Sequence, residues 1–214
     1  MAQAPLVVMV GGGPRGLVAA AVAVDQRRSE QEQVVLVHVA DGRPSADNRL
    51  AAVQKQAEQL GGLAVVVHHA PGLAPPTGEA AVDLSSAQRI LAATSVAMGK
   101  GADRLIWPAA VDGDELEAAR AAEQALLCQH VAHASVTGGD ARLRIDTPLL
   151  EIDDAQLIQL GEELRVDWTS AWACRRGAAE PCQACTGCDR RRQAFVRARV
   201  VDPIDDRRPV AAAG

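Results

Sequence analysis

Four of the five cysteines lie close together near the end of the chain, as Cys174, Cys182, Cys185 and Cys188, with the spacing Cys-x7-Cys-x2-Cys-x2-Cys. A Cys-x-x-Cys pair brings two thiolates to one ion from a tight turn. Four sulfur ligands that leave no open position predict a closed, tetrahedral zinc site with a structural role. An iron–sulfur cluster, or four reduced thiols without metal, are the alternatives, and the long first spacing favours zinc. The fifth cysteine, Cys128, is expected to be a buried, inert thiol.

A glycine-rich segment near the start is the second candidate for chemistry. It follows a short apolar run and precedes a helical stretch, so its backbone N–H groups would point at an anion with a helix dipole behind them. The candidate nucleotide-binding residues are Gly11, Gly12, Gly13, Arg15 and Gly16. Gly-x-Gly-x-x-Gly spacing also fits a Rossmann-type dinucleotide site, which needs an acid after the second strand. Asp41 is the candidate for that acid, so this interpretation stays open.

Apolar runs that alternate with amphipathic stretches must position these two sites. Strands are expected at residues 6–10, 34–39, 63–67, 104–107 and 142–145. Helices are expected at residues 17–28, 45–60, 86–98, 114–133 and 153–164, with a loop at 68–78. This alternation predicts an α/β fold with a mostly parallel sheet and helices on both faces. We divide the chain into an α/β domain at 1–171, a small metal-binding module at 172–200 and a flexible tail at 201–214.

Composition excludes several function classes. The 214 residues carry a net charge of −5, with three Trp, one Phe and no Tyr, so neither an electrostatic nor a stacking signal for nucleic acid is strong. The apolar run at 17–24 is too short to span a membrane. The first residues lack the cationic segment of a signal peptide. A cytoplasmic protein with reduced cysteines is therefore expected.

The cysteine segment resembles a known family. Residues 172–174, 181–188 and 190–195, together with Thr147-Pro148-Leu149, are similar to segments of the 7-cyano-7-deazaguanine synthase family of PP-loop ATPases, which makes preQ0 in queuosine biosynthesis. The resemblance implies a HUP-type (adenine nucleotide alpha hydrolase-like) sheet and zinc bound by the four cysteines. It also implies ATP with magnesium, a deazapurine substrate, and the conversion of 7-carboxy-7-deazaguanine and ammonia to a nitrile through an adenylated carboxylate. A homodimer is a candidate assembly.

The glycine segment departs from the family's Ser-Gly-Gly-x-Asp-Ser loop. Both hydroxyls are missing from Gly11-Gly12-Gly13-Pro14-Arg15-Gly16, and Arg15 stands where the family has an acid. Asp154 stands where the family has a Lys, and residues 86–89 and 112–114 replace two other family segments. Two interpretations follow. One is a C–N ligase of impaired activity in which Arg15 and Arg89 meet phosphate directly. The other is a non-catalytic, zinc-stabilised pseudo-enzyme or partner subunit.

Overall fold

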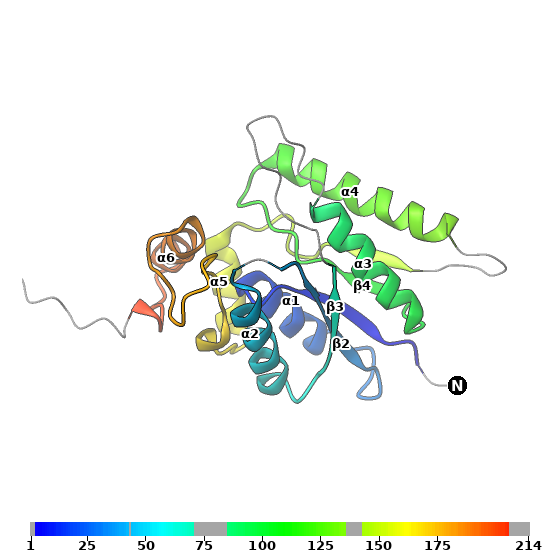
Figure 1. The fold of residues 1–214 in the computed structure, drawn as a ribbon, viewed down its shortest axis with the longest axis horizontal. Coiled ribbons are helices and arrows are strands. Elements are labelled where there is room, and N and C mark those ends of the chain that lie inside the picture. The colour runs from blue at the N-terminus through cyan, green and yellow to red at the C-terminus, as the bar shows by residue number, and fades with distance from the viewer. Residues whose placement is uncertain (1–2, 43, 71–84, 136–142, 206–214) are drawn as a thin grey trace, which may run out of the picture.

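The computed structural model describes residues 3–42, 44–70, 85–135 and 143–205 (Figure 1). The predicted loop at 68–78 and the predicted tail fall largely outside these ranges. In the described part of the chain, no helix combines the length and the apolar character that crossing a bilayer requires.

Five parallel strands form one sheet in the order β3-β2-β1-β4-β5. The strands are β1 (Leu6–Val10), β2 (Val34–Ala40), β3 (Ala64–His69), β4 (Arg104–Ile106) and β5 (Arg144–Asp146). In register, Leu6 of β1 lies opposite Val34 on one side and Arg104 on the other. The central strand is fully flanked and apolar, as expected for a parallel sheet buried on both faces. The predicted fold class is confirmed. Each predicted strand matches an observed one to within two residues, although residue 142 lies outside the described ranges.

Six α-helices and one short 3-10 helix are described. They are α1 (Pro14–Asp25), α2 (Ala46–Gln59), α3 (Ser85–Gly99), α4 (Glu115–Ala134), α5 (Asp154–Glu163), η1 (Trp168–Ser170) and α6 (Thr186–Ala198). The predicted caps are present, because Asp114 accepts from the Glu117 N–H and Asp153 from the Gln156 N–H. Helix α1 begins three residues earlier than expected, since Pro14 at its first position has a backbone angle suited to a helix start.

Alternate residues of each strand enter two separate cores. Val8 and Leu36 point to the side covered by α1, α2 and α5, whereas Val7 and Val35 point to the side covered by α3 and α4 (Figure 1). Cys128 is buried in the second core, as predicted, and burial raises its pKa.

The C-terminal segment packs into the first core. Helix α6 lies against α5 (Figure 1), and its Phe195 meets Trp168 edge to face, with ring centroids 5.3 Å apart. Arg191 on the same helix is buried, and it bonds to both carboxylate oxygens of Asp202 at 2.9 Å. Asp202 was expected in the flexible tail, yet it is 7% exposed. The reason is that a buried guanidinium requires a partner, and Asp202 supplies it.

Candidate metal centre and phosphate loop

The four cysteines at the end of the chain converge, although they come from three different local structures. Cys174 follows η1, Cys182 lies in a loop, and Cys185 and Cys188 stand at the start of α6. Their sulfur atoms all lie within 4.8 Å of one another, with Cys185 Sγ 3.6 Å from Cys188 Sγ and 4.0 Å from Cys174 Sγ. A tetrahedron of thiolates around one ion, with metal–sulfur bonds of about 2.3 Å, has sulfur separations of about 3.8 Å. These residues could therefore hold a single metal ion.

Backbone N–H groups surround these sulfur atoms. Cys174 Sγ accepts from the N–H groups of Arg176 and Cys182 at 3.4 Å, and Cys185 Sγ accepts from Arg175 at 3.5 Å. Burial raises the pKa of the Cys185 thiol, but N–H donors from Arg175 and Cys188 outweigh it and lower that pKa to about 6. Burial also raises the pKa of Cys188, to about 12, with its contact to Cys185 adding to the effect. Cys185 thus favours the thiolate form that binds metal.

The turns between the cysteines explain two residue choices. Gln183 has a φ of +59°, in the left-handed region that turns the chain back between Cys182 and Cys185. At Gly187 a Cβ atom would stand 2.1 Å from the carbonyl oxygen of Ala173. Only glycine lets α6 approach the Cys174 segment this closely.

The glycine loop joins β1 to α1, and hydrogen bonds that other residues donate to its carbonyl groups hold it in place. Gly12 has a φ of +76°, and a Cβ there would stand 2.5 Å from the Arg49 carbonyl oxygen. The Gly12 carbonyl accepts from Gln56 Nε2 at 2.8 Å and from the Trp172 N–H at 2.7 Å. Gly16 lies against the end of β1, where its Cβ would be 3.2 Å from the Gly11 nitrogen. These glycines therefore satisfy close backbone packing, whether or not an anion binds.

Arg15 projects from the first turn of α1 onto a buried acid. Its guanidinium donates to Asp154 Oδ1 at 3.1 Å, and Arg190 from α6 pairs with the other oxygen of the same carboxylate. The Asp154 side chain is only 5% exposed, and its backbone N–H donates to Asp112. Burial lowers the pKa of Arg15, while Asp154 opposes that effect. The two residues that depart from the family pattern, Arg15 and Asp154, thus contact each other.

A second buried acid is shared in the same way. Asp41 follows β2 and lies within 3.3 Å of Arg49 Nη1 and 4.0 Å of Arg89 Nη2. Arg49 also donates to the Gly11 carbonyl at 3.0 Å. The acid that a Rossmann-type site would offer to a ribose is therefore engaged by arginine.

A cavity of about 650 Å³ opens at the carboxyl edge of the sheet, where β1 lies between β2 and β4. Ligands of doubly wound sheets bind at this position, because the helices diverge there. The lining brings together Gly13 of the glycine loop and Cys174 of the four-cysteine cluster. It includes six arginines, namely Arg15, Arg49, Arg89, Arg175, Arg190 and Arg191. It also includes two indole rings, Trp107 and Trp172.

Sequence reasoning placed Gly11, Gly12, Gly13, Arg15 and Gly16 in one site and the four cysteines in another. It did not find Arg49 or Arg190, which approach from α2 and α6. Arg49 lies on a helix expected from its apolar face, and nothing in that pattern says where its polar face points. The signal that could have found Arg190 was the exchange of charge at positions 15 and 154, since a newly buried acid requires cationic neighbours.

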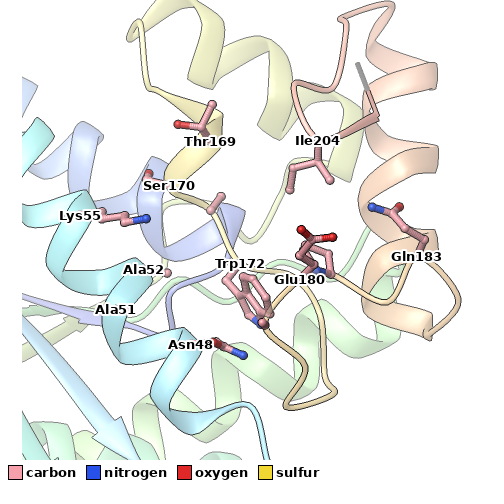
Figure 2. A pocket seen from close by; sticks show the side chains of 13 residues that line it. Asn48, Ala51, Ala52, Lys55, Thr169, Ser170, Trp172, Glu180, Gln183 and Ile204 are labelled. Carbon is pink, nitrogen blue, oxygen red and sulfur yellow. The ribbon is translucent and has the colours of Figure 1, made fainter. Parts of the chain in front are cut away.

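A second cavity, of about 490 Å³, lies on the other side of Trp172, between α2 and the cysteine loop (Figure 2). Asn48 and Lys55 line it from α2, Thr169 lines it from η1, and Glu180 lines it from the loop. Asn48 Nδ2 donates to the Ala178 carbonyl at 2.8 Å, which joins the loop to α2. The first cavity is lined by six arginines, whereas the described lining of this one has a single cation, Lys55, and a single acid, Glu180.

Comparisons with known proteins find relatives that match the segment containing the cysteines. Residues 122–199, which contain all four cysteines but not the glycine loop, match the family model described as "Queuosine biosynthesis protein QueC". The chain is 36% identical over 76 residues to a 7-cyano-7-deazaguanine synthase of Acidobacterium capsulatum, covering 36% of this chain and 32% of that protein. A second such synthase, from Trichodesmium erythraeum, is 37% identical over 62 residues, covering 29% and 28%. These two alignments thus span about a third of each relative.

A longer alignment covers nearly the whole chain. It joins 227 positions with a 7-cyano-7-deazaguanine synthase of Chlorobium phaeobacteroides at 26% identity, covering 95% of this chain and 97% of that protein. Among solved structures, the U34-tRNA thiolase NcsA from Methanococcus maripaludis, solved with its [4Fe-4S] cluster, superposes with a TM-score of 0.57 at 14% identity, over 91% of this chain and 64% of that one. The thiolase comparison shows a shared fold. The resemblance to 7-cyano-7-deazaguanine synthases is confirmed, and it is strongest around the metal centre.

Proposed function

We propose that this chain is a 7-cyano-7-deazaguanine synthase-like protein that keeps the zinc-stabilised fold but no longer activates a carboxylate with ATP and magnesium. The observation that carries this proposal is the contact between Arg15 and Asp154. A loop that assists adenylation must orient phosphate oxygens and support magnesium, which prefers oxygen ligands such as carboxylates. At this loop the side chain offered is a guanidinium, and the nearby carboxylate is bonded to two arginines.

The free energy of the missing hydrogen bonds is large enough to slow the reaction strongly. A hydrogen bond to a charged group contributes about 1.5–3 kcal/mol, and the altered loop lacks both hydroxyls and the acid. Losing two or three such contacts, about 3–9 kcal/mol, would slow phosphoryl or adenylyl transfer by a factor of about 10² to 10⁶, since each 1.36 kcal/mol is tenfold in rate. Such a chain would act as a non-catalytic subunit or sensor. If it is active, its reaction would be the ATP-dependent C–N ligation of its relatives, at a much lower rate.

We propose that the resident metal is zinc rather than an iron–sulfur cluster. Each thiolate of a cubane cluster ligates a different iron, so its four sulfur ligands stand farther apart than those around one ion. The separations of 3.6 and 4.0 Å fit a single tetrahedral ion. Iron analysis and visible absorption distinguish the two, because zinc is colourless. The likeness to the cluster-containing thiolase concerns the fold. A metal held by four thiolates also suits the reducing cytoplasm, where we expect the protein to act.

The test is an assay for the nitrile product. The metal-loaded chain is incubated with 7-carboxy-7-deazaguanine, ammonia, ATP and magnesium, and the product is measured by mass spectrometry. The synthase of Chlorobium phaeobacteroides, run in parallel, is the positive control. We expect product from the control and none above background from this chain. Nitrile formation at a rate near that of the control would overturn the proposal. Binding of NAD in place of ATP would instead support the dinucleotide interpretation of Gly11, Gly13 and Gly16.

A further inference from the structure

We infer that the second cavity, between α2 and the cysteine loop, binds a small zwitterion of the amino-acid type, with its carboxylate at Lys55 and its ammonium group at Glu180. The inference goes beyond the proposed function and does not rest on it. The described lining of this cavity includes no residue of the glycine loop and none of the four cysteines, so it is a separate site.

Two opposite charges face a cavity whose described lining is otherwise uncharged. Figure 2 shows Lys55 of α2 and Glu180 of the cysteine loop on opposite sides of this space. Within the described part of the chain, neither side chain forms an ion pair or a hydrogen bond with another residue. Both are exposed, so a ligand can reach them from solvent. A ligand that pairs with both groups must carry one negative and one positive charge.

One face of α2 forms the side of the cavity that carries the cation. Asn48, Ala51 and Lys55 follow one another at intervals of three and four residues, which places them on the same face of the helix. The alanine fills little of the space between the two polar side chains. Asn48 donates through Nδ2 to the Ala178 carbonyl at 2.8 Å, and its Oδ1 can accept from a ligand. This side therefore combines a cation with a hydrogen-bond acceptor.

The loop that carries the acid is fixed on both sides of it. The Ala178 carbonyl is held from α2, and a Cβ at Gly177 would overlap the carbonyl oxygen of Pro44, so the loop packs closely there. Pro181 follows Glu180, and a proline restricts the residue before it to extended backbone. The Glu180 backbone thus stands at a fixed place at the cavity, while its side chain can turn toward a ligand.

The rest of the lining suits a short, uncharged body between the two charges. Trp172 and Ile204 offer apolar surface, and Gln183 offers a side-chain amide (Figure 2). The volume of about 490 Å³ lies in the range of small-molecule sites. A free amino acid and a dipeptide share the required chemistry, and the ends of the dipeptide lie up to about 3.5 Å farther apart. A ligand with a single charge would pair with only one of the two side chains.

The experiment is a titration of the metal-loaded chain with phenylalanine and with alanyl-phenylalanine, followed by tryptophan fluorescence. Phenylalanine amide, which lacks the carboxylate, and N-acetylphenylalanine, which lacks the ammonium group, are titrated alongside. We expect both zwitterions to bind in the millimolar range and each cap to weaken binding by about two- to fivefold, because exposed ion pairs contribute little. The zwitterion that binds more tightly identifies the source. A capped probe that binds as tightly as phenylalanine would overturn the inference, as would no binding of either zwitterion at millimolar concentration.

Two neutralising variants locate the site, because each removes the partner of one ligand group. Glu180→Gln should weaken phenylalanine binding by about two- to fivefold and leave N-acetylphenylalanine unchanged. Lys55→Gln should weaken phenylalanine equally and leave phenylalanine amide unchanged. Lys100→Gln, which removes a cation outside this lining, should change none of these affinities. Phenylalanine binding that neither Glu180→Gln nor Lys55→Gln alters would place the ligand elsewhere and overturn the inference.

The metal content of the Glu180→Gln chain is measured as well, because Glu180 is two residues from Cys182. If that variant loses its metal, the comparison of capped and free probes on the unaltered chain still decides. Nitrile formation in the synthase assay would contradict the proposed function and leave this site as it is. Equal binding of capped and free probes would contradict this inference and leave the proposed function as it is.

Discussion

The four-cysteine cluster and the glycine loop meet at one cavity, but their residues serve different purposes. In the metal centre the four cysteines and the glycine that lets α6 approach them all serve one geometry. In the glycine loop the glycines set the backbone, while Arg15 beside them is bonded to Asp154. Backbone packing preserves a fold, whereas a few side chains decide its chemistry. The function proposed above is the case in which the fold is kept while the side chains that would use ATP are lost.

The largest effect is expected from breaking the metal centre. Cys185→Ser should release the metal and lower the thermal midpoint by roughly 10 °C or more, because a structural zinc site contributes its binding energy to folding. Metal content and tryptophan fluorescence report this directly, since Trp168 packs on Phe195 of α6. Cys128→Ser, which alters the cysteine outside the cluster, should keep its metal. A Cys185→Ser chain with a full equivalent of tightly held metal would contradict the four-cysteine site.

The second-largest effect is expected at the ion pair between Arg191 and Asp202, which fixes α6 to the core independently of any metal. Arg191→Met leaves the Asp202 carboxylate buried without its partner, so we expect a loss of about 3–5 kcal/mol of unfolding free energy. The neighbouring Arg192 is only partly buried, where it pairs with Asp189 and donates to the Gln183 carbonyl, so Arg192→Met should lower that free energy by only about 1–1.5 kcal/mol. Urea denaturation of both variants measures the difference. Similar small losses would mean that Asp202 belongs to a loosely held tail, as the sequence suggested.

A smaller effect tests whether the glycine loop is fixed by packing. Gly12 and Gly62 share a φ of +76°, but a Cβ at Gly62 has nothing within 4 Å, whereas at Gly12 it meets Arg49. Gly62→Ala should cost about 1 kcal/mol for the backbone angle alone. Gly12→Ala should cost roughly 3 kcal/mol, because the clash adds to that angle. Equal costs, measured by denaturant unfolding, would show that the loop can move away from α2.

The smallest effect is a dependence on pH at the link between α5 and α6. Burial raises the pKa of Asp112, but the Asp154 N–H and Arg197 outweigh it and hold that pKa below its ordinary value of 3.8. The ionised form is thus favoured in the fold, and its contribution is present above about pH 4 and lost as pH falls through the lower folded pKa. Asp112→Asn should remove this dependence. Denaturation midpoints that fall in parallel for both chains on acidification would rule it out.

The fold could be predicted because its determinants are local. Apolar runs such as 6–10 and 34–39 specify buried parallel strands, and Asp114 and Asp153 mark helix starts through hydrogen bonds a few residues away. The cysteine site could also be predicted from the sequence, because the Cys-x-x-Cys spacing indicates tight turns. The cavity could not be predicted. Arg49 and Arg190 reach it from two helices that are distant in sequence, and helical periodicity does not determine which polar side chains meet at a sheet edge.

The assignment of zinc, the division of the chain into domains and the loss of catalysis stay predictions. They share one central claim, that the metal-held fold persists while its phosphate loop no longer activates a carboxylate. The most direct test is the exchange of labelled pyrophosphate into ATP by the metal-loaded chain, with magnesium and 7-carboxy-7-deazaguanine present. We predict no exchange that depends on the carboxylate substrate. Exchange at a rate like that of a 7-cyano-7-deazaguanine synthase measured alongside would contradict the claim.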